Sequence, residues 1–209
     1  MKGGTIVCLG DSITASNSVS VLDGWPARLQ QQLAAHGPWR IYNRGVSGQT
    51  TRDALERLEK DVLSLLPGWV LIEFGINDSS FRPRQKVPRV SREDFAGCLD
   101  EIVRQIRAAR GRPILVLNHP LGAPDPRQPN GQTRAANLHA YHARTRRVAR
   151  KWGCALADLH GRLTRHGLSV WRSQGLRKDG IHLTTSGHRM YAAALFDELV
   201  PRGLGPTIR

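Results

Sequence analysis

The chain has little of what membrane-spanning, disulfide-stabilised or nucleic-acid-reading proteins need. None of its apolar runs approaches the roughly 18 residues of a membrane span. Its three cysteines, Cys8, Cys98 and Cys154, cannot all pair, and each lies in an apolar strand or helix pattern, which predicts three reduced, buried thiols. Aromatic residues are few and follow no known reading motif among the basic residues, which argues against specific nucleic-acid recognition.

Acidic residues are also scarce, so the chain carries a formal net charge of +14, and most of its 31 basic residues are arginine. Charge at this level attracts polyanions without selecting among them. No Cys/His cluster has the spacing of zinc ligands. His139 and His142 lie three apart on a predicted helix, but no acidic or thiol partner is close in sequence. We therefore expect neither a metal ion nor a cofactor.

The two ends of the chain lead to further expectations. Near the amino end, Lys2 precedes the short apolar segment 5–9, which leads straight into Ser12. Cleaving that segment as a signal peptide would remove a strand, so we expect a cytoplasmic protein; secretion by way of a trimmed leader stays open. The length predicts one domain over residues 1–200 that buries about 70% of its unfolded surface. Residues 201–209, with two glycines and two prolines, are expected to be a loosely held tail.

Apolar, strand-like runs alternate with amphipathic helical segments along the whole chain. Such alternation predicts an α/β fold, a parallel sheet with right-handed crossovers and helices on both faces. Asp23 is expected to cap the first long helix, and Ser91 to open a capping box. The predicted strands are 5–9, 41–43, 69–74, 114–117 and 155–157, and the predicted helices are 23–33, 51–65, 91–110, 133–152 and a last one beginning at 184 or 185.

Chemically informative residues follow the first three predicted strands. Gly10-Asp11-Ser12 follows the first, the segment 43–50 follows the second, and Gly75-Ile76-Asn77-Asp78 follows the third. In a parallel sheet, ligands bind beyond the carboxyl ends of the strands, so these residues should meet at one edge. Far downstream, Asp179-Gly180-Ile181-His182 places an acid three residues before an imidazole. A serine and a histidine with its own carboxylate are the parts of a nucleophile–base–orienter relay.

With these four blocks in this order, the chain resembles the SGNH hydrolases, also called the GDSL esterase/lipase family. The blocks span positions 6 to 189, and the marker residues would be Ser12, Gly48, Asn77 and His182. The resemblance implies a three-layer α/β/α sandwich with a five-stranded parallel sheet in the flavodoxin-like order 2-1-3-4-5. The sequence differs from the family pattern at two places: Gln49 stands where many members carry Asp, and Ala15-Ser16 replaces a frequent glycine. These differences leave open which branch of the family, and so which substrate, applies.

The resemblance also implies a role for each residue. Ser12 would be the nucleophile, His182 the base and later the acid, and Asp179 the group that fixes the imidazole tautomer. The oxyanion hole would combine the Ser12 backbone N–H, the Gly48 N–H and the Asn77 side-chain amide. Gly45 is a rival to Gly48 within the same segment, and Asp11 is expected to cap a helix.

The expected activity is that of a serine esterase acting on a short acyl ester, most plausibly acetyl, of a carbohydrate or similar alcohol. A lysophospholipase, thioesterase, aryl-esterase or acyltransferase would use the same residues, and a non-catalytic glycan- or polyanion-binding module is an alternative of another class. Three predicted loops, 79–92, 121–134 and 165–178, would rim the site with arginines and Trp171. They suit an anionic or sugar-bearing ester, although solvated arginines and a buried Trp171 explain the same pattern.

Overall fold

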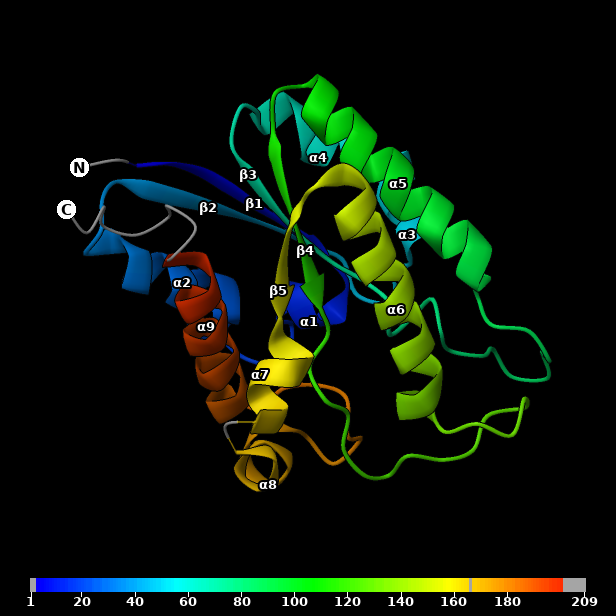
Figure 1. The fold of residues 1–209 in the computed structure, drawn as a ribbon. Helices are drawn as coiled ribbons and strands as arrows, with labels where there is room; N and C mark the ends of the chain where they lie inside the picture. Colours follow the sequence, from blue (N-terminus) through cyan, green and yellow to red (C-terminus); the bar gives the residue numbers. More distant parts are fainter. Residues whose placement is uncertain (1–2, 166, 201–209) are drawn as a thin grey trace.

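One parallel sheet forms the centre of the computed structural model, which describes residues 3–165 and 167–200. The strand order is β2-β1-β3-β4-β5, and all four neighbouring pairs are parallel (Figure 1). The strands are β1 (Gly4–Gly10), β2 (Trp39–Gly45), β3 (Trp69–Glu73), β4 (Arg112–Leu117) and β5 (Ala155–Asp158). The expected sheet and its order are therefore confirmed.

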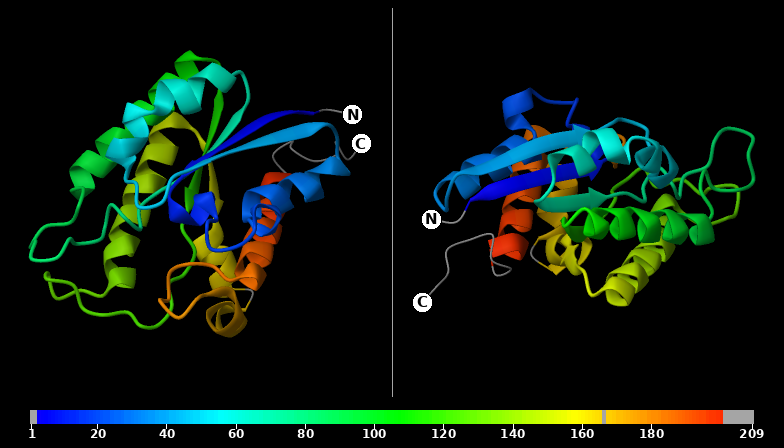
Figure 2. Two further views of the ribbon diagram at one scale, coloured as in Figure 1. Left: turned by 180° about the vertical axis from the view of Figure 1, so that it is seen from behind. Right: turned by 90° about the horizontal axis from the view of Figure 1, so that it is seen from above.

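Side chains alternate between the two faces of each strand, so a buried strand supplies two separate cores. In β1, Ile6 and Cys8 belong to one apolar cluster, whereas Val7 and Leu9 belong to the other. Both faces of the sheet must therefore be covered by helices. Figure 2, left, shows this arrangement, with α5 and α6 on one side of the sheet and α2 and α9 on the other. The predicted three-layer α/β/α sandwich is confirmed.

The two helical layers have different members. The core of one face includes residues of α1 (Ser12–Ala15), α2 (Trp25–Ala34), α7 (Leu159–Arg165) and α9 (Thr185–Leu199). The core of the other face includes residues of α3 (Thr51–Glu56), α4 (Leu58–Asp61), α5 (Arg92–Ala108) and α6 (Arg134–Trp152). Side-chain hydroxyls cap three of these helices: Ser91 at α5, Thr133 at α6 and Thr184 at α9.

Two helix predictions were wrong in detail. Asp23 does not cap α2; it ends a short 3-10 helix, η1 (Val21–Asp23), and Gly24 is the N-cap. The Asp23 carboxylate instead pairs with Arg28 at 2.5 Å. The helix expected over 51–65 is broken into α3, α4 and the 3-10 helix η2 (Leu63–Leu65). The first break lies at Arg57, whose backbone is non-helical and whose side chain is bonded to the neighbouring Gln49.

The third rim loop is largely helical, contrary to expectation. It holds α8 (Leu168–Val170) and a π-helical turn, η3 (Trp171–Gly175). Trp171 is fully buried and donates its indole N–H to the carbonyl of Pro120 at 2.8 Å, so this ring is part of the core. Of the two alternatives that the sequence left open for Trp171, the structure therefore supports the buried one.

The remaining expectations concern thiols, membranes and the tail. All three cysteines are free, but only Cys8 is buried, whereas Cys98 on α5 and Cys154 just before β5 are half-buried. The expectation of three buried thiols was therefore correct only for Cys8. Across residues 3–165 and 167–200, no helix combines the length and apolar character needed to cross a bilayer. The predicted tail, 201–209, lies outside the described residues.

Candidate active site

The chain turns sharply at the carboxyl ends of the first three strands, and these turns place three of the predicted residues together. Ser12 opens α1 just after β1, and Asp11 accepts the backbone N–H of Ile13 at 2.9 Å, which makes it the N-cap. Gly48 follows β2, and Asn77 follows β3. His182, in the segment before α9, lines one cleft together with Ser12 and Asn77. It therefore lies at the same edge of the sheet as the three turns.

Ser12, His182 and Asp179 form a continuous hydrogen-bonded chain. The Ser12 Oγ lies 3.0 Å from His182 Nε2, although the two residues are 170 positions apart. On the other side of the ring, His182 Nδ1 lies 2.7 Å from Asp179 Oδ2. A proton on Nδ1 is the one that a carboxylate can accept, which leaves the Nε2 lone pair for the serine hydroxyl. The His182 side chain is 39% exposed, so an incoming substrate can approach it.

A compact turn folds the Asp179 carboxylate back onto its own segment. Asp179 Oδ1 accepts the backbone N–H groups of Ile181 and His182, each at 2.9 Å, while Oδ2 faces the imidazole. Burial opposes ionisation of this carboxyl, but the hydrogen bonds from His182 and from the two amides outweigh it and lower its pKa to about 2. Asp179 is therefore a carboxylate at neutral pH, as an orienter of the imidazole must be.

The two glycines after β2 have different roles in the structure. A Cβ at Gly45 would lie 2.1 Å from the backbone nitrogen of Ala15, so close packing against α1 requires glycine there. The Gly45 N–H is already used, since it donates to Asn43 Oδ1 at 2.9 Å. Gly48 has a φ of +79°, which favours glycine, and its N–H has no acceptor within the described part of the chain. Of the two, Gly48 is the one with a donor to offer.

The Asn77 side chain is held in a fixed orientation. Its Nδ2 donates to the carbonyl of Gln49 at 3.0 Å and to Asp11 Oδ2 at 3.2 Å. These contacts aim the amide between the segment after β2 and the carboxyl beside the serine. Because both N–H groups are engaged, the amide can donate to a further oxygen only by sharing or exchanging one of these bonds.

Two arginines that the sequence did not single out hold the Gly48 segment. Arg57 donates to Gln49 Oε1 at 2.5 Å and to the carbonyl of Gly10, two residues before the serine, at 3.2 Å. Arg89 donates to the Gly48 carbonyl at 2.8 Å. Gln49 thus takes up a contact with Arg57 at the position where many family members carry Asp. The spacing of Arg57 and Asp61, four residues apart and ion-paired in the structure, is the sequence feature that could have drawn attention to Arg57.

Three carboxyl groups are buried beneath the serine turn. Glu73, at the end of β3, accepts the Thr14 hydroxyl at 3.0 Å and is also bonded to Asn118, while Asp78 accepts both the N–H and the hydroxyl of Thr51. Burial raises the pKa of Asp11, Glu73 and Asp78. For Asp11, burial together with repulsion from Asp78 raises the pKa to about 7. Sequence reasoning found only the capping role of Asp11.

A cavity of about 250 Å³ opens directly on Ser12 and His182. Apolar side chains form much of its wall, and Arg134 supplies its one positively charged lining residue. Arg134 donates to the carbonyl of Asp179 at 3.3 Å and so also contacts the turn of the catalytic acid. The predicted loops 79–92 and 121–134 therefore do rim the cavity. The other residues lining it are Ile76, Asn77, Ser79, Ser80, Phe81, Leu121, Gln128 and Ile181.

Comparison with known proteins identifies the family. A sequence profile of the GDSL-like lipase/acylhydrolase family matches residues 8–190. Thioesterase 1/protease 1/lysophospholipase L1 of Escherichia coli K12 is 31% identical over 114 residues, 54% of this chain and 50% of that protein. The chain spans about half the length of several of the curated relatives it matches.

Two further relatives align over nearly the whole chain. An acetylxylan esterase of Geobacillus stearothermophilus is 26% identical over 213 residues, 95% of this chain and 94% of that protein. The crystal structure of a lipase/acylhydrolase from Enterococcus faecalis superimposes with a TM-score of 0.78 at 25% identity, covering 95% of this chain and 96% of that one. Together with the profile match, these findings confirm the resemblance seen in the sequence. The chain belongs to the GDSL-like lipase/acylhydrolase family.

Proposed function

We propose that this protein is a serine esterase in which Ser12, His182 and Asp179 are the catalytic residues. The observation that carries the proposal is the unbroken chain of contacts, 3.0 Å from Ser12 to His182 and 2.7 Å from His182 to Asp179, beside an open cavity. A seryl hydroxyl attacks an ester only if a base takes its proton, and His182 Nε2 is at the distance that this transfer needs.

In the proposed reaction, Ser12 Oγ attacks the ester carbonyl as His182 takes its proton, and the protonated imidazole then hands that proton to the leaving alcohol. Water, deprotonated by the same imidazole, hydrolyses the acyl-enzyme and restores the serine. Asp179 holds Nδ1–H throughout and stabilises the imidazolium. No step requires a metal or a cofactor.

The oxyanion of each tetrahedral intermediate would be bound by the N–H groups of Ser12 and Gly48 and by the Asn77 amide. The free N–H at Gly48 and the anchored orientation of Asn77 support this assignment. The intermediate's oxygen would take the Asn77 N–H that now faces Asp11, since that contact is the longer of the two.

We further propose that the substrate is a short acyl ester, with acetyl as the acyl group, of a carbohydrate or similar alcohol. Two observations support this choice. The cavity of about 250 Å³ is smaller than the roughly 300–1,000 Å³ of sites for drug-sized ligands. One relative that aligns over nearly the full length of both chains carries the name acetylxylan esterase.

Hydrolysis of p-nitrophenyl esters from acetate to palmitate, with Ser12→Ala as the control, tests both levels of the proposal. We expect the highest kcat/KM for acetate and a loss of at least ~10³-fold in the variant. Full activity in Ser12→Ala would refute the catalytic assignment. A maximum at long chains would refute the acetyl-ester proposal and favour a lysophospholipase or thioesterase, with the mechanism unaffected.

A further inference from the structure

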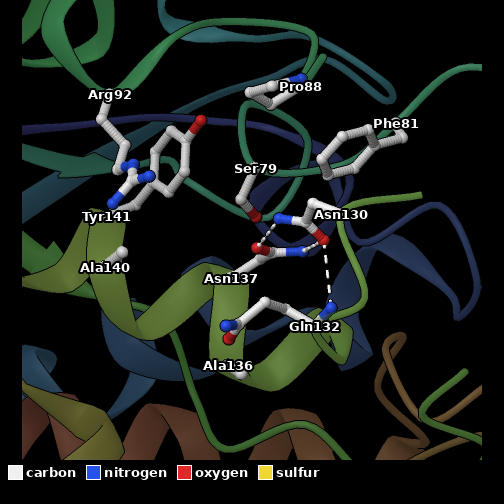
Figure 3. Close-up of a pocket in the computed structure, with 10 residues that line it drawn as sticks. All are labelled: Ser79, Phe81, Pro88, Arg92, Asn130, Gln132, Ala136, Asn137, Ala140 and Tyr141. Carbon is white, nitrogen blue, oxygen red and sulfur yellow. Dashed lines mark hydrogen bonds between the residues drawn. The ribbon is translucent and has the colours of Figure 1, made fainter. Parts of the chain in front are cut away.

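A second cavity of about 240 Å³ adjoins the catalytic one and has no part in the proposed chemistry. It lies between the loop that follows β3 and the amino-terminal half of α6 (Figure 3). Ser79 and Phe81 line both cavities, so the two spaces share a wall at these residues. A substrate group would pass from one space to the other by extending past these two residues.

The two sides of this cavity differ in chemistry. Phe81 and Pro88 form a rigid apolar wall on one side, and the amides of Asn130, Gln132 and Asn137 lie on the other (Figure 3). An acyl tail packed against these amides would displace the water that hydrates them and offer no hydrogen bonds in return. The polar wall therefore argues against this cavity as an extension of an acyl-binding pocket.

The Asn130 and Asn137 amides are preorganised for a ligand that both donates and accepts hydrogen bonds. Asn130 Nδ2 donates to Asn137 Oδ1 at 2.8 Å, and Asn137 Nδ2 donates back to Asn130 Oδ1 at 3.3 Å. The backbone N–H of Gln132 donates to the same Asn130 oxygen at 3.2 Å and fixes the pair to the loop. Each of the two side chains keeps a second N–H, and the Gln132 amide has no partner among residues 3–165 and 167–200.

Such a combination suits a sugar ring. Its hydroxyl groups are at once donors and acceptors, as are side-chain amides, and its C–H face can pack on the ring of Phe81. Arg92 adds a guanidinium, which donates to hydroxyl oxygens, and no acidic side chain is among the residues that line the cavity. A volume of about 240 Å³ is below that of a site for a whole drug-sized ligand, so it fits a unit such as a single ring.

We propose that this cavity is a sugar subsite, which binds the unit next to the esterified one in an oligosaccharide. The inference rests on the proposed carbohydrate-ester function and specifies it further: the enzyme acts on oligosaccharide esters in preference to monosaccharide esters. Phe81 and Gln132 are its specificity-determining residues, the first by packing and the second by hydrogen bonding.

The test compares acetate release from acetylated xylose and from acetylated xylotriose, with p-nitrophenyl acetate as a substrate that cannot reach the subsite. In the wild type we expect a higher kcat/KM for the xylotriose ester. Gln132→Ala removes one neutral hydrogen-bonding group, so its kcat/KM should fall roughly two- to tenfold on the xylotriose ester relative to the xylose ester. Gln31→Ala, at an exposed glutamine of α2 that lines neither cavity, is the matched control and should leave that ratio unchanged.

The possible results distinguish failure of the sugar subsite from failure of the proposed esterase function. The subsite would be overturned by equal kcat/KM on the two glycan esters in the wild type, or by equal losses on both esters in Gln132→Ala. In either case, acetate release that depends on Ser12 would leave the esterase proposal intact. Cleavage of p-nitrophenyl acetate but of neither glycan ester would overturn the carbohydrate substrate together with the subsite. Because Gln132 lies on an exposed loop, its replacement leaves the core packing in place.

Discussion

Removing the charge of Asp11 should change how the stability of this protein depends on pH. The Asp11 carboxyl is fully buried beside the nucleophile, where it caps α1 and accepts an N–H of Asn77. Burial, and to a lesser degree repulsion from Asp78, raises its pKa from 3.8 to about 7. Asparagine has almost the same shape and is an equally good N-cap, so Asp11→Asn removes the charge and keeps the bond from the Ile13 N–H. Its amide nitrogen replaces the oxygen that accepts the Asn77 N–H, a loss that does not depend on pH.

The sign and size of the effect follow from proton linkage. Between pH 3.8 and about 7 the folded protein binds a proton at Asp11 that the unfolded chain has lost, so the free energy of unfolding falls as the pH rises through this window. A shift of about three pKa units corresponds to a cost of about 4 kcal/mol, fully developed above pH 7. Of this cost, about 2–3 kcal/mol develops between pH 5 and pH 8, as a decrease in the free energy of unfolding.

Urea denaturation at pH 5 and pH 8 measures this difference. We expect wild type to lose about 2–3 kcal/mol more stability than Asp11→Asn on going from pH 5 to pH 8. Some pH dependence should persist in the variant, because burial also raises the pKa of Glu73 and of Asp78. Asp100→Asn is the control: ion pairing with Lys151 overcomes burial and lowers the pKa of Asp100, so this carboxylate stays charged over the whole window.

Identical pH dependence of unfolding in wild type and Asp11→Asn would refute the reasoning. It would mean that the Asp11 carboxyl ionises in the folded protein over the same pH range as in the unfolded chain, so that burial does not raise its pKa. A pH dependence in Asp100→Asn that differs from that of wild type would equally show that the effect is not specific to Asp11.

Three further predictions address the oxyanion hole, the turn after β2 and the charge. Asn77→Ala should lower kcat by about 10²–10³ with little change in KM, and a change confined to KM would contradict its role. Gly45→Ala should destabilise the folded protein by about 1–3 kcal/mol, because its Cβ would meet the Ala15 backbone. Gly97→Ala on α5 has open space around its Cβ and should stabilise the protein by about 0.5–1 kcal/mol. Denaturation midpoints of the two variants measure both effects, and a stable Gly45→Ala variant would contradict the close packing. If the basic rim attracts anionic esters, KM for a uronic-acid-bearing ester should rise between low and physiological salt, and indifference to salt would exclude such steering.

Much of the fold could be predicted because it depends on local patterns. Apolar β-type runs separated by amphipathic helices specify a parallel sheet covered on both faces, and Ser91, Thr133 and Gly153 mark helix ends through local hydrogen bonding or backbone conformation. The prediction failed where a distant contact competed with a local preference. Arg57, which bonds Gln49 and the Gly10 carbonyl, interrupts a segment whose apolar spacing alone predicts a continuous helix.

The same division holds at the site. The sequence by itself determined which residues stand at the strand ends, and the family blocks pointed to Ser12, Gly48, Asn77, Asp179 and His182. It also determined the short turn that lets Asp179 reach its own histidine, because that contact spans only three residues.

Only the tertiary structure decided that Ser12 and His182 meet at 3.0 Å, since 170 residues of chain and five strands must fold before they can. It also decided that Trp171 is core rather than substrate wall, and that three carboxyl groups share the space beneath the serine. These features depend on burial and on neighbours from distant segments. Linear spacing does not encode those neighbours, because the packing of the sheet and its helices brings them together.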